Sequence, residues 1–244
     1  MKNVWIKRIC SVLCLLVITG VLCVLGVVMG YKESLKDFFE HSKGVIALED
    51  LEKGFIPQGI GYDATGDTVF ITGYMDNGRK SPIYAYDRSS GKLKNKILML
   101  TEEGDNFRGH AGGLSVYGDR VYIAGSTDAC MFAFSIEEIL GAPYEGTVRA
   151  ADRTSLKRKD DFMRVSFTSV DENYLYAGEF HKGLLFYTHA SHKATAEGVT
   201  QKAYVMGYTL DDQGEAIPGC VYSIPDNVQG ACFHDGYIYL SQSA

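Results

Sequence analysis

The chain has 244 residues with 24 basic and 30 acidic side chains, a formal net charge of −6. At 46% hydrophobic and 22% charged residues, it has the composition of a globular protein, which excludes a wholly disordered chain and a coiled coil. It carries no basic stripe, so we expect no nucleic-acid partner.

The first predicted element is an apolar helix over residues 9–30, which contain no charged side chain. As a helix this stretch would be about 33 Å long, enough to cross a hydrocarbon core of ~30 Å. Lys2, Lys7 and Arg8 precede it, and the positive-inside rule places residues 1–8 in the cytoplasm. We expect a transmembrane signal anchor with an extracytoplasmic body. The alternatives are a cleaved signal peptide, which would make the body a secreted protein, and a buried soluble helix.

A short stalk is predicted next, over residues 31–44. Leu35, Phe38 and Phe39 recur there at helical spacing, which indicates an amphipathic juxtamembrane helix.

The rest of the chain, residues 45–244, repeats one unit four times. The unit is an apolar alternation, a tight turn rich in Gly, Asp or Asn, and a second alternation with an aromatic residue at a constant place, which predicts a β-hairpin. The units begin at Pro57, Ala111, Val165 and Val228. Their aromatic residues are Phe70, Tyr122, Tyr176 and Tyr239.

Each of the first three hairpins is followed by a third alternating run, at residues 83–86, 131–134 and 203–206, and a fourth is clearest at residues 96–100. Four antiparallel strands in about 55 residues are typical of a β-propeller blade. Ser135 begins one of the few helical signals, as the N-cap of a turn over residues 135–140.

The segment PQGI…TVFITGY…SPIYAYDRSSGKL, which begins at Pro57, resembles the repeat of secreted bacterial β-propellers of the NHL and YVTN (quinoprotein-like) kind. That group includes gluconolactonase-type and streptogramin-lyase-type propellers. The resemblance implies an all-β fold of four-stranded antiparallel blades over residues 45–244. It carries no particular activity with it.

The number of units predicts about 3.5 blades, and closed propellers have ~4–8. We therefore expect a truncated part of a propeller of about 6–7 blades. A compact four-bladed ring is the alternative. In a closed ring, the apolar run Val45–Leu48 would be a free strand that completes the last blade.

Aligning the units brings polar residues into two columns at the inner end of the blades. The first column is Gln58, Gly112, Ser166 and Gln229. The second, two residues upstream, is Ile56, His110, Arg164 and Asn227. We predict a ligand-binding site at the mouth of the central channel, formed by Gln58, His110, Arg164, Asn227 and Gln229. Alternatively, these side chains bond to neighbouring backbone.

No catalytic residue, metal site or cofactor is predicted. The columns contain no carboxylate, whereas gluconolactonase-type propellers hold a divalent cation with Glu, Asn and Asp. His110 is a possible general base for a lyase, but no acidic partner is visible in the sequence.

A long insertion after the third hairpin contains His181, His189 and His192. His189-x-x-His192 has the spacing of a transition-metal pair if it is helical. We favour a solvated loop that serves as a recognition surface. Cys130, Cys220 and Cys232 form no disulfide pattern and are expected to be buried apolar residues.

Together these patterns predict a membrane-anchored, extracytoplasmic β-propeller that binds a protein, peptide or glycan without catalysis. The alternatives are an enzyme of the lactonase or lyase type, with its site at the central channel, and a non-functional remnant.

Overall fold

The computed structural model describes residues 16–30, 33, 35–126, 129–158 and 161–243. The chain divides into two compact units, residues 1–45 and 46–244. In the first unit, residues 16–30 are helical and α2 (Lys36–His41) follows them. Within the described ranges, no helix combines the length and the hydropathy needed to cross a membrane. Residues 1–15, which include part of the predicted span, lie outside the described residues.

Among the described residues of the predicted stalk, Glu33 and α2 are helical, and the Phe38 side chain is 64% exposed. Val45–Leu48, the run expected to complete the last blade of a closed ring, has no strand pairing in the structure. Ile46 and Leu48 instead pack against a buried cluster of the first sheet that contains Phe55, Tyr84 and Tyr86. Packing of these two half-buried side chains therefore attaches the segment to the first sheet.

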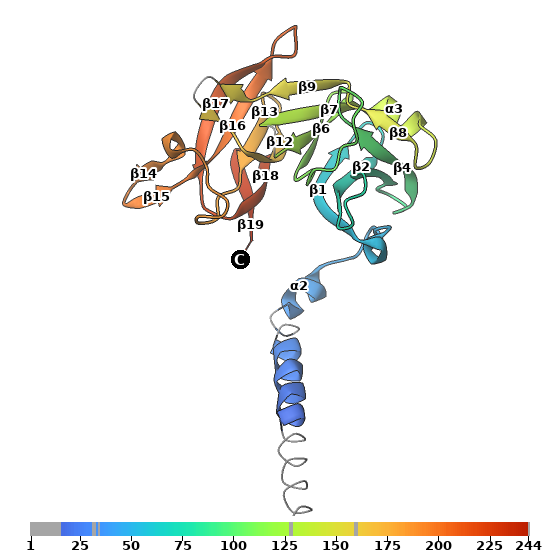
Figure 1. Cartoon of the computed structure of the whole chain (residues 1–244), viewed down its shortest axis with the longest axis vertical. Helices are drawn as coiled ribbons and strands as arrows, with labels where there is room; N and C mark the ends of the chain where they lie inside the picture. Colours follow the sequence, from blue (N-terminus) through green and yellow to red (C-terminus); the bar gives the residue numbers. More distant parts are fainter. Residues whose placement is uncertain (1–15, 31–32, 34, 127–128, 159–160, 244) are drawn as a thin grey trace, which may run out of the picture. The chain divides into compact units, whose positions relative to one another are not determined.

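The second unit is all-β, with sheets that follow one another in chain order (Figure 1). The first sheet has the antiparallel order β1 (Phe55–Asp63), β2 (Thr68–Met75), β3 (Pro82–Asp87) and β4 (Leu93–Leu100), and β8 (Thr147–Arg149) joins β4 in parallel. The second is β5 (Leu114–Tyr117), β6 (Arg120–Gly125), β7 (Cys130–Ser135) and β9 (Asp152–Ser155). The third is β12 (Val165–Val170), β13 (Leu175–Glu179), β16 (Ala203–Leu210) and β17 (Ala216–Ile224). The fourth is the hairpin β18 (Val228–His234) and β19 (Tyr237–Gln242).

Smaller elements connect these sheets. They are the hairpins β10–β11 (Lys157–Arg158, Asp161–Phe162) and β14–β15 (Ala194–Ala196, Val199–Gln201), and the short helices η1 (Leu51–Lys53), α3 (Ile136–Gly141) and η2 (Ala190–His192). The predicted cap of α3 is confirmed, because Ser135 Oγ accepts a hydrogen bond from the Glu138 N–H at 3.3 Å.

The repeat predicted from the aromatic residues is confirmed by the strand register. In each of the four main sheets the aromatic residue lies on the second strand, opposite the same position of the first strand. The pairs are Phe70 with Gly61, Tyr122 with Ser115, Tyr176 with Ser169 and Tyr239 with Cys232. The four hairpins are therefore equivalent units, as in a β-propeller.

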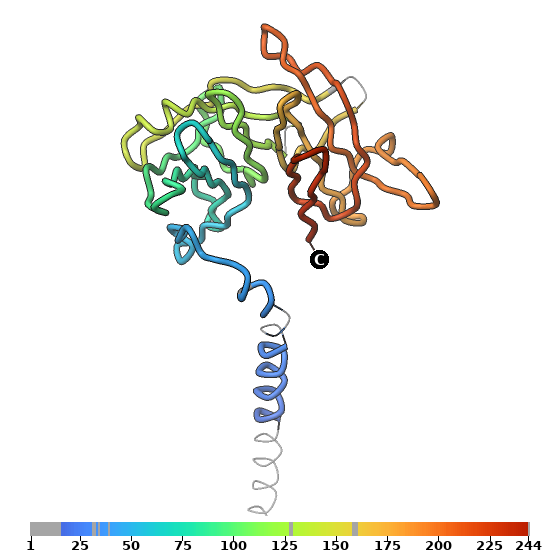
Figure 2. The backbone as a smooth tube through the Cα atoms, turned by 180° about the vertical axis from the view of Figure 1, so that it is seen from behind, coloured from blue at the N-terminus to red at the C-terminus, as the bar shows by residue number. Residues whose placement is uncertain are grey.

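The innermost strands of neighbouring sheets lie side by side, β1 against β5, β5 against β12 and β12 against β18 (Figure 2). Glycine makes this approach possible. A Cβ on Gly59 would lie 2.7 Å from the Leu114 backbone nitrogen, and one on Gly113 would lie 2.3 Å from the Phe167 Cα. Apolar clusters fill the spaces between the first and second, second and third, and third and fourth sheets. The second unit therefore has a β-propeller-like fold.

Of the three cysteines in this unit, only Cys130 is buried as predicted. Cys220 is half-buried and Cys232 is exposed, and none of the three forms a disulfide within the described part of the chain.

Candidate functional site

Four of the five predicted site residues line one cavity of about 420 Å³. They come from four successive sheets: Gln58 from β1, His110 from the segment before β5, Arg164 from the residue before β12, and Gln229 from β18. Phe180, Phe186 and Ser166 complete much of the wall. Residues far apart in the chain therefore reach one cavity because the sheets repeat around it.

β-Bulges explain why the first column turns into this cavity. The strand register shifts between Pro57 and Gly59, and in the same place between Val165 and Phe167 and between Val228 and Gly230. The residues skipped by the ladders are Gln58, Ser166 and Gln229, all of which line the cavity. Because a bulge re-aims a side chain out of the regular alternation, three sheets direct an equivalent polar residue to one place.

Arg164 is the one cationic residue among the described residues that line this cavity, and none of them is acidic. Its guanidinium carbon lies 4.5 Å from the centre of the Tyr187 ring and 5.8 Å from that of Phe162. Both distances are in the range of a cation–π contact, which holds the side chain without neutralising its charge. The cavity therefore favours a ligand with an anionic group.

His110 and Gln58 have local contacts. The His110 ring lies 4.5 Å from the Tyr74 ring, and the Gln58 amide donates to the Pro57 carbonyl at 3.0 Å. The described residues give His110 no hydrogen bond to a carboxylate, the partner expected for a general base oriented by an acid.

The structure does not bring Asn227 to the wall of the cavity. Asn227 has a positive φ of 66°. Its N–H donates to the His181 carbonyl at 2.9 Å, and its own carbonyl accepts from the Ser243 N–H at 2.9 Å. The amide oxygen of its side chain is buried and has no hydrogen-bond partner among the described residues. Asn227 therefore connects the His181 segment to the end of β19.

A second group of polar residues, not predicted as a site, lies around His192. Glu179 ends β13 and is fully buried. Its Oε2 is 2.8 Å from His192 Nδ1 and also accepts from the Tyr204 N–H at 3.3 Å. On the other side of the imidazole, Asp161 Oδ1 is 3.0 Å from His192 Nε2. His192 is thus held between two carboxylates.

These contacts shift the pKa values of the group. Burial lowers the pKa of His192, but hydrogen bonds and attraction from Glu179 and Asp161 outweigh that effect, so its pKa is raised. Burial likewise raises the pKa of Asp161, but His192 and Ser191 more than compensate and leave it lowered. The interpretation of the whole insertion as a solvated loop is wrong for His192 and His181, which are only 4% and 7% exposed.

The position of Glu179 in the repeat unit could have drawn attention to it. Glu179 lies three residues after the aromatic residue of its unit, and the same place is taken by Gly73 in the first sheet and Gly125 in the second. The fourth sheet has Gln242 at the same place. Glu179 is therefore the one acidic residue at this position among the four sheets.

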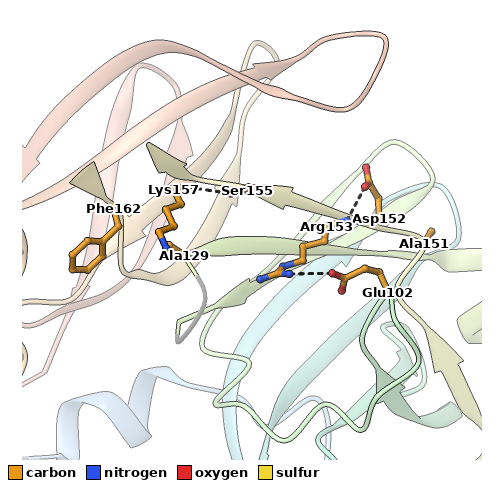
Figure 3. Close-up of a pocket in the computed structure, with 8 residues that line it drawn as sticks. All are labelled: Glu102, Ala129, Ala151, Asp152, Arg153, Ser155, Lys157 and Phe162. Atoms are coloured by element: carbon orange, nitrogen blue, oxygen red, sulfur yellow. Dashed lines mark hydrogen bonds and ion pairs between the residues drawn. The ribbon is translucent and has the colours of Figure 1, made fainter. Parts of the chain in front are cut away.

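A larger cavity of about 730 Å³ lies beside β9, with Arg153, Glu102 and Lys157 in its wall (Figure 3). Arg153 Nη1 pairs with Glu102 Oε1 at 3.2 Å, and its guanidinium carbon is 5.8 Å from the Phe132 ring. The arginine is therefore already neutralised.

No family model and no curated protein matches the chain. Similar solved structures are the hydrazine synthase of Kuenenia stuttgartiensis (9% identity, TM-score 0.41), a protein from Lactobacillus plantarum (12%, 0.38) and the glutaminyl cyclase of Myxococcus xanthus (9%, 0.36). The matches cover 72%, 76% and 78% of this chain and 39%, 48% and 86% of those chains. The chain thus spans less than half the length of the first two. At these TM-scores, the similarities carry no argument about function, and the fold rests on the strand pairing described above.

Proposed function

We propose that the chain is a membrane-anchored, extracytoplasmic binding module whose ligand occupies the cavity between Gln58, His110, Arg164 and Gln229. The observation that carries this proposal is the convergence of polar side chains from four successive sheets, two of them glutamines at equivalent bulges. Such convergent polar groups in a partly aromatic cavity are typical of a ligand site.

The chemistry of the wall indicates the class of ligand. A guanidinium, an imidazole and two primary amides can donate hydrogen bonds to a carboxylate and its neighbouring hydroxyl or carbonyl oxygens. Phe180 and Phe186, whose rings lie 5.5 Å apart, offer an apolar surface beside them. We therefore propose a peptide or glycan segment that carries a carboxylate.

The proposed anchor is the apolar segment 9–30, with residues 1–8 in the cytoplasm and the stalk 31–44 outside. Its support is the sequence: no charge within the segment and three cations before it. In the same way, the placement of this propeller-like unit among the NHL and YVTN propellers, and a complete ring of about 6–7 blades, are proposals that rest on the repeat pattern.

The test is a binding panel on the full chain in detergent. Oligosaccharides with and without a uronic acid, and peptides with a free or an amidated C-terminus, are titrated by calorimetry. We expect the chain to bind one acidic compound of the panel and not to bind the neutral counterpart of that compound. Arg164→Gln should weaken that binding about 10-fold or more, because a hydrogen bond to a charged group contributes about 1.5–3 kcal/mol.

The matched control is Arg120→Gln, an arginine outside the cavity whose side chain is 39% exposed. It should leave the affinity unchanged. Equal binding by wild type and Arg164→Gln would place the ligand elsewhere, and turnover of a lactone or ester by the wild type would instead support the enzyme alternative.

A further inference from the structure

We propose that Asp161, His189 and His192 bind one zinc ion. One ligand atom from each residue lies within 4.8 Å of the others. The closest pairs are His192 Nε2 with Asp161 Oδ1 at 3.0 Å and His189 Nδ1 with Asp161 Oδ1 at 3.5 Å. Zinc binds such atoms tetrahedrally at about 2.0–2.2 Å, which sets neighbouring ligand atoms about 3.3–3.5 Å apart. Small side-chain movements would therefore complete the site.

Local structure supplies the two histidines. His189 is the N-cap of η2 and His192 is its last residue, so this single turn of 3-10 helix brings their ring centres to 5.7 Å. Asp161 begins β11, in a separate hairpin that precedes the third sheet in the chain. The three ligands would therefore connect the insertion to the hairpin before β12. This is the folded counterpart of the His-x-x-His spacing seen in the sequence.

Glu179 provides the second observation that points to a metal. Its Oε2 lies 2.8 Å from His192 Nδ1, so a hydrogen bond from Nδ1 leaves Nε2 as the ligand atom that faces Asp161. Metal-binding histidines nearly always donate their other ring nitrogen to such a carboxylate, which fixes the ring. Glu179 is itself held by the N–H groups of Arg164 and Tyr204.

The site is open on one side. The side chains of Asp161 and His189 are 42% and 37% exposed, whereas that of His192 is 6% exposed. Ser191 Oγ lies between them, 2.6 Å from His189 Nδ1 and 3.2 Å from Asp161 Oδ2, and would give way to the ion. Zinc can thus enter from solvent and keep a water molecule as fourth ligand.

The ligand set favours zinc over hard cations. Two imidazoles and one carboxylate suit zinc and its neighbours in the first transition series, whereas Ca²⁺ and Mg²⁺ select oxygen ligands. The rival interpretation is a purely structural network, in which the two carboxylates hold a protonated His192 and no ion binds.

Calorimetric titration of the metal-free full chain with Zn²⁺ separates the two interpretations. We expect one zinc per chain. His189→Ala, at a half-exposed position that leaves the fold intact, should weaken binding more than about 100-fold, and Glu179→Gln should weaken it about 10–100-fold. His234→Ala, which changes an exposed histidine outside the group, should bind as the wild type does.

A second readout is the visible absorption of bound Co²⁺, which reports a tetrahedral site directly and should be lost in His189→Ala. The proposal is overturned if the wild type binds no stoichiometric zinc, if His189→Ala binds as tightly as the wild type, or if Ca²⁺ or Mg²⁺ binds and zinc does not. An unchanged melting temperature of His189→Ala shows that any loss is one of ligands and not of fold.

Discussion

At the scale of single residues, Asp50 is a buried carboxylate of the second unit that is held by three side chains. It is 5% exposed, and its carboxylate accepts hydrogen bonds from Lys53 at 2.7 Å, Lys96 at 2.6 Å and the Tyr84 hydroxyl at 2.9 Å. The bonds from Lys53 and Lys96 hold the pKa of Asp50 well below its usual range, although burial opposes them.

Because its pKa is lower in the folded state, Asp50 contributes stability above pH ~4, and this contribution is lost as the pH falls further. We expect Asp50→Asn to lower the free energy of unfolding by about 2–3 kcal/mol at pH 7. The difference from the wild type should shrink when denaturant unfolding is repeated at pH 3. Asp212→Asn, at an exposed turn position, is the control and should change neither value. A difference that stays constant with pH would contradict this role of Asp50.

At the scale of elements, the close approach of β5 and β12 depends on Gly113, since a Cβ there would lie 2.3 Å from the Phe167 Cα. A backbone atom cannot move aside as a flexible side chain can. We expect Gly113→Ala to lower the free energy of unfolding by about 3 kcal/mol, at the upper end for overpacking.

Gly141→Ala is the matched control, because no atom lies within 4 Å of a Cβ at the end of α3 and its φ is not positive. Thermal or denaturant unfolding should show it within about 0.5 kcal/mol of the wild type. Equal stability of the two variants would mean that the inner strands are farther apart than described.

Local patterns were enough to predict the hairpins, and four of the five predicted site residues line the cavity. Turn residues and alternation set each hairpin, and the repeat then aligned Gln58, His110, Arg164 and Gln229. The prediction that Asn227 lines the cavity failed, because this residue has a positive φ and its backbone forms hydrogen bonds with His181 and Ser243. The group around His192 was not predicted as a site for another reason. Its partners Glu179 and Asp161 come close to it only through tertiary packing, which the spacing of residues in the sequence does not reveal.

At the scale of the whole molecule, each sheet buries the aromatic residue of its second strand when another sheet packs over it. Tyr176 is 2% exposed and its ring stacks on Phe233 of the fourth sheet at 3.7 Å. The equivalent Tyr239 is 56% exposed. Equivalent positions in the repeat therefore contribute differently to the free energy of unfolding.

We expect Tyr176→Ala to lower the free energy of unfolding by about 3–5 kcal/mol, as large-to-small changes in a core do. Tyr239→Ala, the matched variant in the fourth sheet, should cost less than about 1 kcal/mol. Unfolding curves of the two variants make the comparison. Equal losses would mean that Tyr239 is covered in the folded protein and that the fourth sheet is packed differently.

The most direct test of the central claim is a crystal structure of the chain bound to the tightest ligand of the acidic panel. We predict the ligand between Gln58 and Gln229, with its carboxylate within hydrogen-bond distance of the Arg164 guanidinium. A ligand bound on another surface, or side chains from the four sheets that face separate surfaces, would contradict it.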